Sequence, residues 1–199
     1  MEIKKVQEIL NKVSDEIIAN KDYLTDLDRS IGDADHGVNM AKGFGFAKEA
    51  IEGEFSDYKS LFMKISMTLI SKVGGASGPL YGTFFMKFAQ ELNNIEDLNR
   101  EVLNKAFQSG VEGVKQRGKA NLLDKTMVDV LEPVADALNE GKSYKEIIEL
   151  AKEKMEKTSE YKANKGRASY VGERSIGHID PGAASSYLMI KTAFGELND

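Results

Sequence analysis

The sequence contains no cysteine, and only three of its 199 residues are proline. The absence of cysteine excludes disulfide bonds and metal centres with thiolate ligands. No run of apolar residues is long enough to span a membrane, and the N-terminal residues lack the apolar stretch of a signal peptide or an anchor. We therefore expect a cytoplasmic protein that has no contact with membranes.

An excess of basic residues is also missing. The chain has 27 Lys and Arg against 32 Asp and Glu, and the two signs alternate along it. A nucleic-acid-binding protein should carry a basic stripe, so this class is not favoured. With 41% apolar residues, 199 residues suffice for one domain with a sizeable core, and we expect residues 1–199 to form it.

Alternating strand patterns are absent as well, and apolar residues instead recur every three or four positions. We expect an all-α protein of about eight helices. One helix should start near Val38, and the others should cover residues 2–23, 58–73, 80–92, 96–115, 126–138, 143–157 and 180–197.

Local signals mark several helix ends. Ser143 and Glu146 form a capping box, and Asp180 precedes a proline that suits the first position of a helix. Asp124 is a candidate N-cap for the helix that follows it. Pro133 should kink that helix or confine it to the turns on either side.

Three aspartates crowd the motif LDRSIGDADHGVNM: Asp28, Asp33 and Asp35. Like charges at this spacing repel, whereas hard divalent cations need several oxygen ligands. The motif therefore predicts one or two Mg²⁺ ions that also hold phosphate oxygens. Helix capping is the alternative, but it explains one aspartate rather than three. A calcium EF-hand is excluded, because the twelfth residue from Asp33 is Phe44 instead of Glu.

The motif VGGASGPLYGT links two apolar segments. Its glycines allow backbone N–H groups to converge, and Ser77 adds a hydroxyl at the start of a helix, as in sites that bind phosphate. The spacing is not that of a Walker A loop. Close packing of two helices through small residues explains the motif equally well.

Two more motifs carry polar groups. DKTMVDV presents the hydroxyl of Thr126, although simple capping is the better explanation of this motif taken by itself. GRASYVGERSIGHIDPGAAS brings Arg167, Arg174 and His178, and arginine suits phosphate binding. With His36, both histidines of the chain lie in glycine-rich stretches, yet they form no zinc-binding pair, and no G-x-S-x-G motif supports a serine hydrolase.

These parts predict phosphoryl transfer: carboxylates for a metal, a glycine loop for phosphates and an arginine loop to close the site. A site for the phosphoryl acceptor is missing, so we expect the acceptor to lie on another protein.

Together with RGKANLLDKTMVDVLEPV, these motifs resemble the nucleotide-binding L subunit of dihydroxyacetone (glycerone) kinase over essentially the whole chain. The resemblance implies a barrel of eight antiparallel helices with ADP or ATP at one end, and two Mg²⁺ ions on Asp28, Asp33 and Asp35. It implies nucleotide contacts from His36, Gly37, Val38, Asn39, Ala76, Ser77, Gly118, Thr126, Met127, Arg167, Asp180, Pro181 and Gly182. No residue of the chain is assigned as catalytic with certainty, although Arg167 or Arg174 can stabilise the transfer.

In this family dihydroxyacetone is carried by a separate K subunit. In the phosphotransferase-system version an M subunit returns phosphate from phosphoenolpyruvate to resident ADP. With no K domain in its 199 residues, the chain is expected to be of this type, and a homodimer is a further expectation. The alternatives are an ATP-dependent dihydroxyacetone or fatty-acid kinase subunit, a nucleotide-sensing co-regulator of a transcription factor, and a purely structural bundle.

Overall fold

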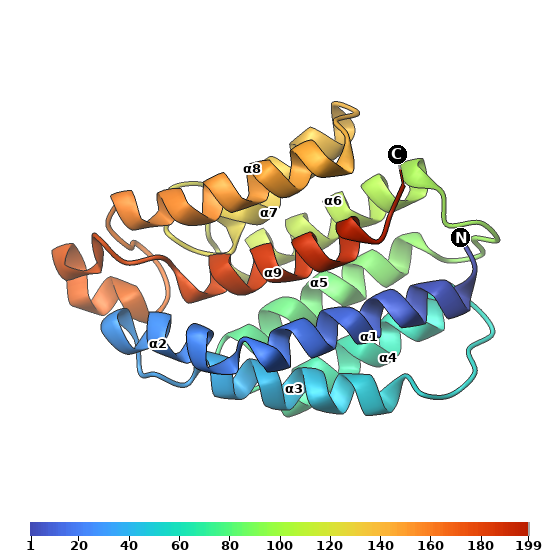
Figure 1. Ribbon diagram of the computed structural model, residues 1–199, viewed down its shortest axis with the longest axis horizontal. Coiled ribbons are helices and arrows are strands. Elements are labelled where there is room, and N and C mark those ends of the chain that lie inside the picture. The colour runs from blue at the N-terminus through green and yellow to red at the C-terminus, as the bar shows by residue number, and fades with distance from the viewer. Residues whose placement is uncertain (199) are drawn as a thin grey trace.

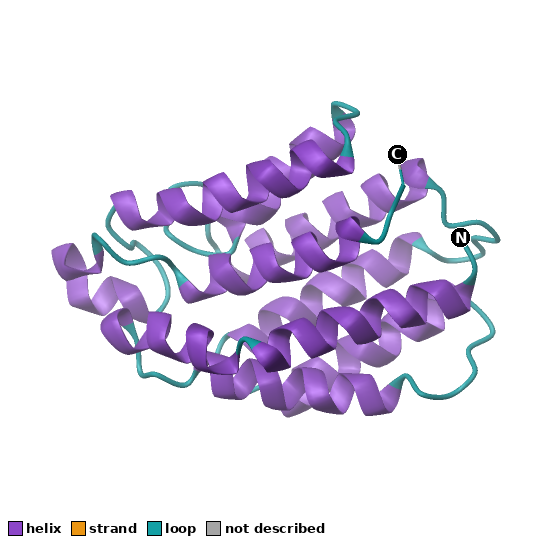
Figure 2. Cartoon of the chain, viewed as in Figure 1, coloured by secondary structure: helices purple, strands orange, loops and turns teal. Residues whose placement is uncertain are grey.

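The computed structural model describes residues 1–198, and in these residues all regular structure is helical (Figure 2). The helices are α1 (Ile3–Ala19), α2 (Lys21–Ile31), α3 (His36–Ala50), α4 (Tyr58–Lys72), α5 (Ser77–Glu91), α6 (Arg100–Gly118), α7 (Val128–Asn139), α8 (Tyr144–Lys157) and α9 (Pro181–Gly195), with the short 3-10 helices η1 (Thr158–Glu160) and η2 (Arg167–Ser175) between α8 and α9. The prediction of an all-α protein is confirmed. None of the described helices is long and apolar enough to cross a membrane.

The helices form a closed ring. From α3 to α9 each α-helix packs on the next one in the chain, α9 packs on α1, and α1 packs on α3. Neighbours in this ring run antiparallel (Figure 1). The helix α2 lies outside the ring and contacts α3, α9 and η2. The expected barrel of eight antiparallel helices is therefore present, with α2 as an additional helix at one end.

The core fills the inside of the ring. The apolar face of α1 is buried through Val6, Ile9, Val13 and Ile17, and phenylalanine side chains of α4, α5, α6 and α9 pack against one another. A cavity of about 120 Å³ remains in the middle. Its wall is almost entirely apolar and comes mainly from α1, α5, α6 and α9.

Several helix bounds differ from the sequence-based expectation. The helix expected over residues 2–23 ends at Ala19, because Asn20 leaves helical geometry and its side-chain amide donates to the carbonyl of Glu16 at 2.8 Å. The next helix then continues to Ile31. The capping box at Ser143 and the N-cap at Asp180 are confirmed.

Pro133 lies inside α7, which runs from Val128 to Asn139, so the proline does not confine the helix to the turns on either side. The prediction about the N-cap of α7 is wrong. Asp124 is not its N-cap, since the Asp124 carboxylate accepts the N–H of Asn121 instead. Asp129, inside the first turn, instead accepts the N–H groups of Leu123 and Thr126 in the preceding loop. The helix is therefore anchored by a carboxylate inside its first turn.

Two glycines of α3 lead to opposite predictions. A Cβ at Gly37 would lie 2.0 Å from the carbonyl oxygen of Lys21, whereas a Cβ at Gly45 would meet nothing within 4 Å. Gly37→Ala should therefore lower the free energy of unfolding by about 2 kcal/mol through overpacking. Gly45→Ala should raise it by about 0.5–1 kcal/mol, because alanine favours the helix. Urea unfolding of both variants checks this pair, and equal effects would contradict the packing of α2 on α3.

Candidate functional site

Four helices begin at the same end of the ring. Because neighbours run antiparallel, the N-termini of α3, α5, α7 and α9 meet there, and residues at all four starts line one cleft. The N-terminus of a helix carries partial positive charge and free N–H groups. At α5 the N-cap is Ala76, which offers no side-chain acceptor to the first-turn N–H groups. This end of the molecule is therefore built to attract an anion.

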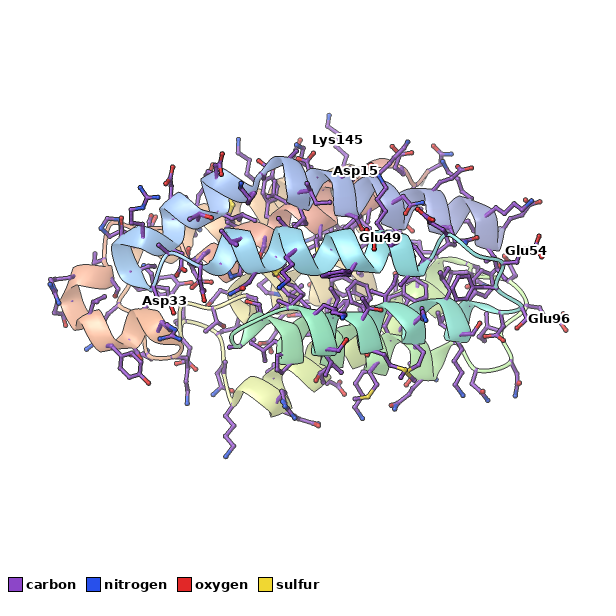
Figure 3. All side chains as sticks on the ribbon, turned by 90° about the horizontal axis from the view of Figure 1, so that it is seen from below. Asp15, Asp33, Glu49, Glu54, Glu96 and Lys145 are labelled. Carbon is purple, nitrogen blue, oxygen red and sulfur yellow. The ribbon has the colours of Figure 1, made fainter. Side chains whose placement is uncertain are left out.

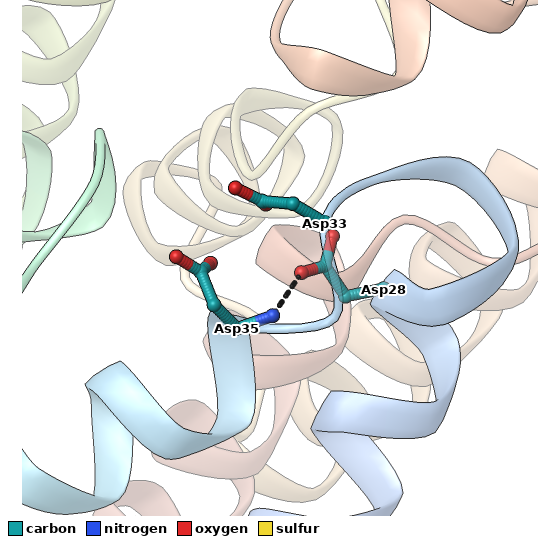
Figure 4. Close-up of side chains that lie close together, drawn as sticks. All are labelled: Asp28, Asp33 and Asp35. Atoms are coloured by element: carbon teal, nitrogen blue, oxygen red, sulfur yellow. Dashed lines mark hydrogen bonds between the residues drawn. The ribbon is translucent and has the colours of Figure 1, made fainter.

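The three aspartates lie at the rim of this cleft. Carboxylate oxygens of Asp28, Asp33 and Asp35 fall within 4.8 Å of one another, and Figure 4 shows the side chains around one small space. Ala34, between the last two, adopts a left-handed backbone conformation with φ of 59°, which shapes the turn. Figure 3 shows Asp33 at one end of the molecule, whereas Glu54 and Glu96 lie at the other end.

Asp28 is the most fixed of the three. It is 6% exposed, and its Oδ2 accepts the backbone N–H groups of Asp35 at 2.9 Å and of His36 at 3.1 Å. A Cβ at position 32 would lie 1.9 Å from Asp28 Oδ1, so only glycine leaves room for this carboxylate. The loop therefore positions Asp28 through its backbone and leaves Asp33 and Asp35 at the opening.

The negative charge of this cluster is only partly balanced. Arg167, from η2, contacts Asp33 at 2.9 Å. Burial and the neighbouring charge of Asp33 raise the pKa of the Asp35 carboxyl. Three oxygen ligands with surplus negative charge suit a hard divalent cation better than zinc or copper.

A series of hydrogen-bonded polar side chains leads inward from the glycine-rich connection before α5. The Ser77 hydroxyl lies 3.1 Å from Nδ1 of His36, and Nε2 of His36 lies 3.0 Å from the hydroxyl of Ser185. The hydroxyl of Tyr81 lies 2.7 Å from that of Ser185 and 2.9 Å from that of Ser186. Burial lowers the pKa of His36 to about 4, so its ring is neutral at pH 7 and is fixed by hydrogen bonds on both nitrogens.

The cleft has two parts that share a wall. The polar part has a volume of about 170 Å³ and contains the aspartates, the start of α5, Arg167 and the start of α9. The second part, of about 270 Å³, adjoins it through Ala76, Leu80, Thr126 and Met127. It is lined mostly by small and apolar side chains. One part thus suits a charged group, and the other suits a flat apolar one.

Most of the predicted site residues line one of these two parts. The polar part takes Asp28, Asp33, Asp35, His36, Asn39, Ala76, Ser77, Thr126, Met127, Arg167, Asp180, Pro181 and Gly182, and Gly118 lines the apolar part. Four residues lie elsewhere. Gly37 is packed against α2, Val38 is 50% exposed, and Arg174 and His178 are exposed and line neither part.

Sequence reasoning missed other residues of the cleft wall. Gly74 and Gly75 line it and belong to a motif that the sequence did single out. Tyr81 and Lys125 line it too, and Ser185 contacts His36. Tyr81, Lys125 and Ser185 are deeply buried. They also belong to motifs quoted above, but nothing in those motifs marks these three as site residues.

The DAK2 domain model matches residues 30–195. The ADP-binding subunit DhaL of PEP-dependent dihydroxyacetone kinase 1 from Listeria innocua serovar 6a is 48% identical over 181 residues, which cover 90% of this chain and 89% of the relative. The corresponding subunit of PEP-dependent dihydroxyacetone kinase from Escherichia coli K12 is 43% identical, over 92% of this chain and 91% of the relative.

A solved structure has the same fold. The dihydroxyacetone kinase of C. freundii, in complex with AMP-PNP and Mg²⁺, matches 99% of this chain and 34% of its own, with a TM-score of 0.80 and 24% identity. The match of the family model and the identity to full-length relatives together show that this chain belongs to the DAK2 domain family.

Proposed function

We propose that this chain is the ADP-binding subunit of a phosphoenolpyruvate-dependent dihydroxyacetone kinase, a kinase that acts on an alcohol group. The observation that carries the proposal is the convergence of a three-carboxylate loop, four helix N-termini and an arginine on one cleft. The names of the full-length relatives support it. The chain would act as one nucleotide-binding domain.

The residues present fit a divalent metal. Asp28, Asp33 and Asp35 supply only oxygen ligands, and their charge exceeds what Arg167 balances. We assign all three as ligands of two Mg²⁺ ions. Bound Mg²⁺ would neutralise the charge of the phosphates during transfer.

The rest of the cleft would bind the nucleotide. The free N–H groups at the start of α5 and the hydroxyl of Ser77 would hold phosphate oxygens. Thr126, Asp180 and Gly182 would contact the nucleotide from the starts of α7 and α9. The base would enter the apolar part, between Leu80 and Gly118. Among the predicted contacts, Gly37 and Val38 would act through the backbone or through packing only.

The chain's own residues would orient the transfer rather than perform it by acid–base chemistry. His36 is neutral and enclosed, so it would fix the hydroxyl of Ser77 instead of moving a proton. Arg167 would hold the metal loop closed through Asp33 and stabilise charge at the transfer end. Arg174 does not line the cleft, so Arg167 is the arginine that we assign to the transfer.

The proposal includes two partners. Dihydroxyacetone would be presented at the cleft by a K subunit, and a phosphotransferase-system M subunit would rephosphorylate ADP that stays on this chain. In this arrangement the chain needs no binding site of its own for dihydroxyacetone, because the K subunit would hold this acceptor.

The test is to identify the nucleotide carried by the purified chain. The chain is desalted extensively and unfolded by heat, and the supernatant is separated by anion-exchange chromatography. We expect near-stoichiometric ADP, because a resident coenzyme survives desalting. An empty supernatant combined with weak Mg-ATP binding would indicate an exchanging ATP substrate. No Mg-dependent nucleotide binding at all would overturn the proposed function.

A further inference from the structure

Lys125 is buried completely, in the connection between α6 and α7. Its Nζ donates to three backbone carbonyls, those of Thr158 at 2.6 Å, Ser175 at 2.7 Å and Tyr161 at 3.2 Å. A lysine ammonium has three N–H bonds, and here each has an acceptor. Buried lysine is rare in proteins and costs free energy unless its donors are satisfied. We therefore expect Lys125 to have a specific structural or functional role.

That role is not direct binding of phosphate. Lys125 lies beside Thr126 in the cleft wall, where a lysine would ordinarily be assigned to an anion. All three of its N–H bonds already point at carbonyl oxygens, so none remains for a ligand. The side chain is also 0% exposed to solvent.

The three carbonyls belong to one segment, residues 158–180, which connects α8 to α9 and is called the arginine segment below. Two of them, Thr158 and Tyr161, precede Arg167, and the third, Ser175, follows it. The ammonium therefore joins the two sides of this segment at its base. Further bonds reinforce the base, since Ser175 Oγ accepts the N–H of Ala163 at 2.9 Å.

The other end of the arginine segment reaches the metal loop. Arg167 contacts Asp33 at 2.9 Å, and Ala168 packs with Ile31 and Ala163 in a small separate apolar cluster. This cluster is too small to hold the segment by burial alone. The helix η2 packs on α2. Figure 1 shows α2 at the end of the molecule where α3 and α9 begin. The position of Arg167 thus depends on how the base of the segment is fixed.

We propose that Lys125 is a positioning residue for the nucleotide site: it fixes the base of the arginine segment to the α6–α7 connection and thereby holds Arg167 at the metal loop. The effect of Lys125 on nucleotide binding rests on the function proposed above. Its effect on the order of the arginine segment does not depend on that function. Its physical basis is that one ammonium satisfies three carbonyls that come from both sides of Arg167.

The first experiment is hydrogen exchange of the nucleotide-free chain, read by mass spectrometry of peptides. In Lys125→Met, three buried carbonyls lose their donor, so exchange over residues 158–178 should accelerate by roughly tenfold or more. Peptides from α4 and α5 should not change. Lys162→Met is the matched control, because Lys162 lies in the same segment but is exposed and pairs only with Glu173. It should exchange like the parent.

The second experiment is calorimetric titration with Mg-ADP. Lys125→Met should weaken binding roughly tenfold. Arg167→Ala should weaken it as well, and Lys125→Met should cause little further loss in the Arg167→Ala background, because Lys125 acts through Arg167. A lysine with a purely structural role would instead give independent, additive losses in the two backgrounds.

The outcomes separate the two proposals. Unchanged exchange over residues 158–178 in Lys125→Met overturns the inference, whatever the nucleotide does. Additive losses in the double variant overturn the link to Arg167. Failure of the parent chain to bind Mg-ADP overturns the proposed function. The exchange result then still decides whether Lys125 fixes the base of the arginine segment. If Lys125→Met does not fold, Lys125→Gln, which keeps two donors, should fold and show intermediate exchange; parent-like exchange in it would overturn the inference.

Discussion

Replacing Asp35 with asparagine should weaken Mg-ADP binding by at least about 100-fold and leave the helical content unchanged. The three carboxylates lie within 4.8 Å of one another, and each is assigned to the metal. Asparagine keeps the size of the side chain but removes a negative charge and weakens the ligand. Titration calorimetry with and without Mg²⁺ measures the loss, and circular dichroism measures the helices.

The same variant should show an opposite effect on the metal-free chain. Burial and the charge of Asp33 raise the pKa of Asp35, so the ionised carboxylate is unfavourable before metal binds. Asp35→Asn should therefore unfold at a slightly higher urea concentration than the parent without Mg²⁺. Asp22→Asn, at an exposed position of α2, is the control and should bind Mg-ADP normally. Parent-like binding by Asp35→Asn would contradict the metal assignment.

Asp180→Asn should make the chain more stable than the parent above pH 7. Burial raises the pKa of the Asp180 carboxyl from the ordinary 3.8 to about 7, with nearby Asp129 adding to the effect and nearby Lys125 opposing it. Between these values the unfolded chain ionises Asp180 and the folded chain does not, so the free energy of unfolding of the parent falls as the pH rises. The difference corresponds to about 4 kcal/mol.

Asparagine avoids this loss and keeps the helix cap. Asp180 Oδ2 accepts the N–H of Ala183 at 2.8 Å, and an amide oxygen can do the same. Urea unfolding of parent and variant at pH 4 and pH 8 measures the difference, in which the titration of other groups such as His36 cancels. The advantage of the variant should be small at pH 4 and large at pH 8.

A second N-cap aspartate provides the control. Asp57 begins α4, accepts the N–H of Ser60 at 2.7 Å and is exposed. That hydrogen bond lowers the pKa of Asp57, so its contribution to stability is present above its ordinary pKa and is lost at lower pH. Asp57→Asn should therefore be slightly less stable than the parent at pH 8. If both variants respond to pH in the same direction, burial is not what governs Asp180.

The helices and many of their ends follow from local sequence. Ser143 caps α8 with Glu146, and Asp180 with Pro181 begins α9, because a cap involves only residues within one turn. Asp28, Asp33 and Asp35 could be grouped for the same reason, since they lie close together in the sequence, at the end of α2 and in the connection to α3. Where two aspartates compete, local pattern fails. Asp124 precedes α7 and Asp129 lies in its first turn, and in the folded chain both carboxylates accept N–H groups of the preceding loop instead of capping the helix.

Other contacts could not be read from the sequence at all. His36 and Ser185 are 149 positions apart, and the bond between them exists only because α9 lies beside the start of α3. Lys125 bonds carbonyls 33, 36 and 50 positions away. Carbonyl groups occur at every residue and carry no sequence signal, so the partners of such a lysine cannot be predicted.

The sequence by itself determined that the chain is helical, where most helices lie and which loop carries the carboxylates. The reason is that helical periodicity and caps are properties of neighbouring residues. Only the tertiary structure decided that four helix N-termini meet at one cleft, that Arg167 reaches Asp33 and that Val38, Arg174 and His178 lie outside the cleft. These depend on the closing of an antiparallel ring, in which α9 packs on α1, and such closure is decided by packing between segments far apart in the chain.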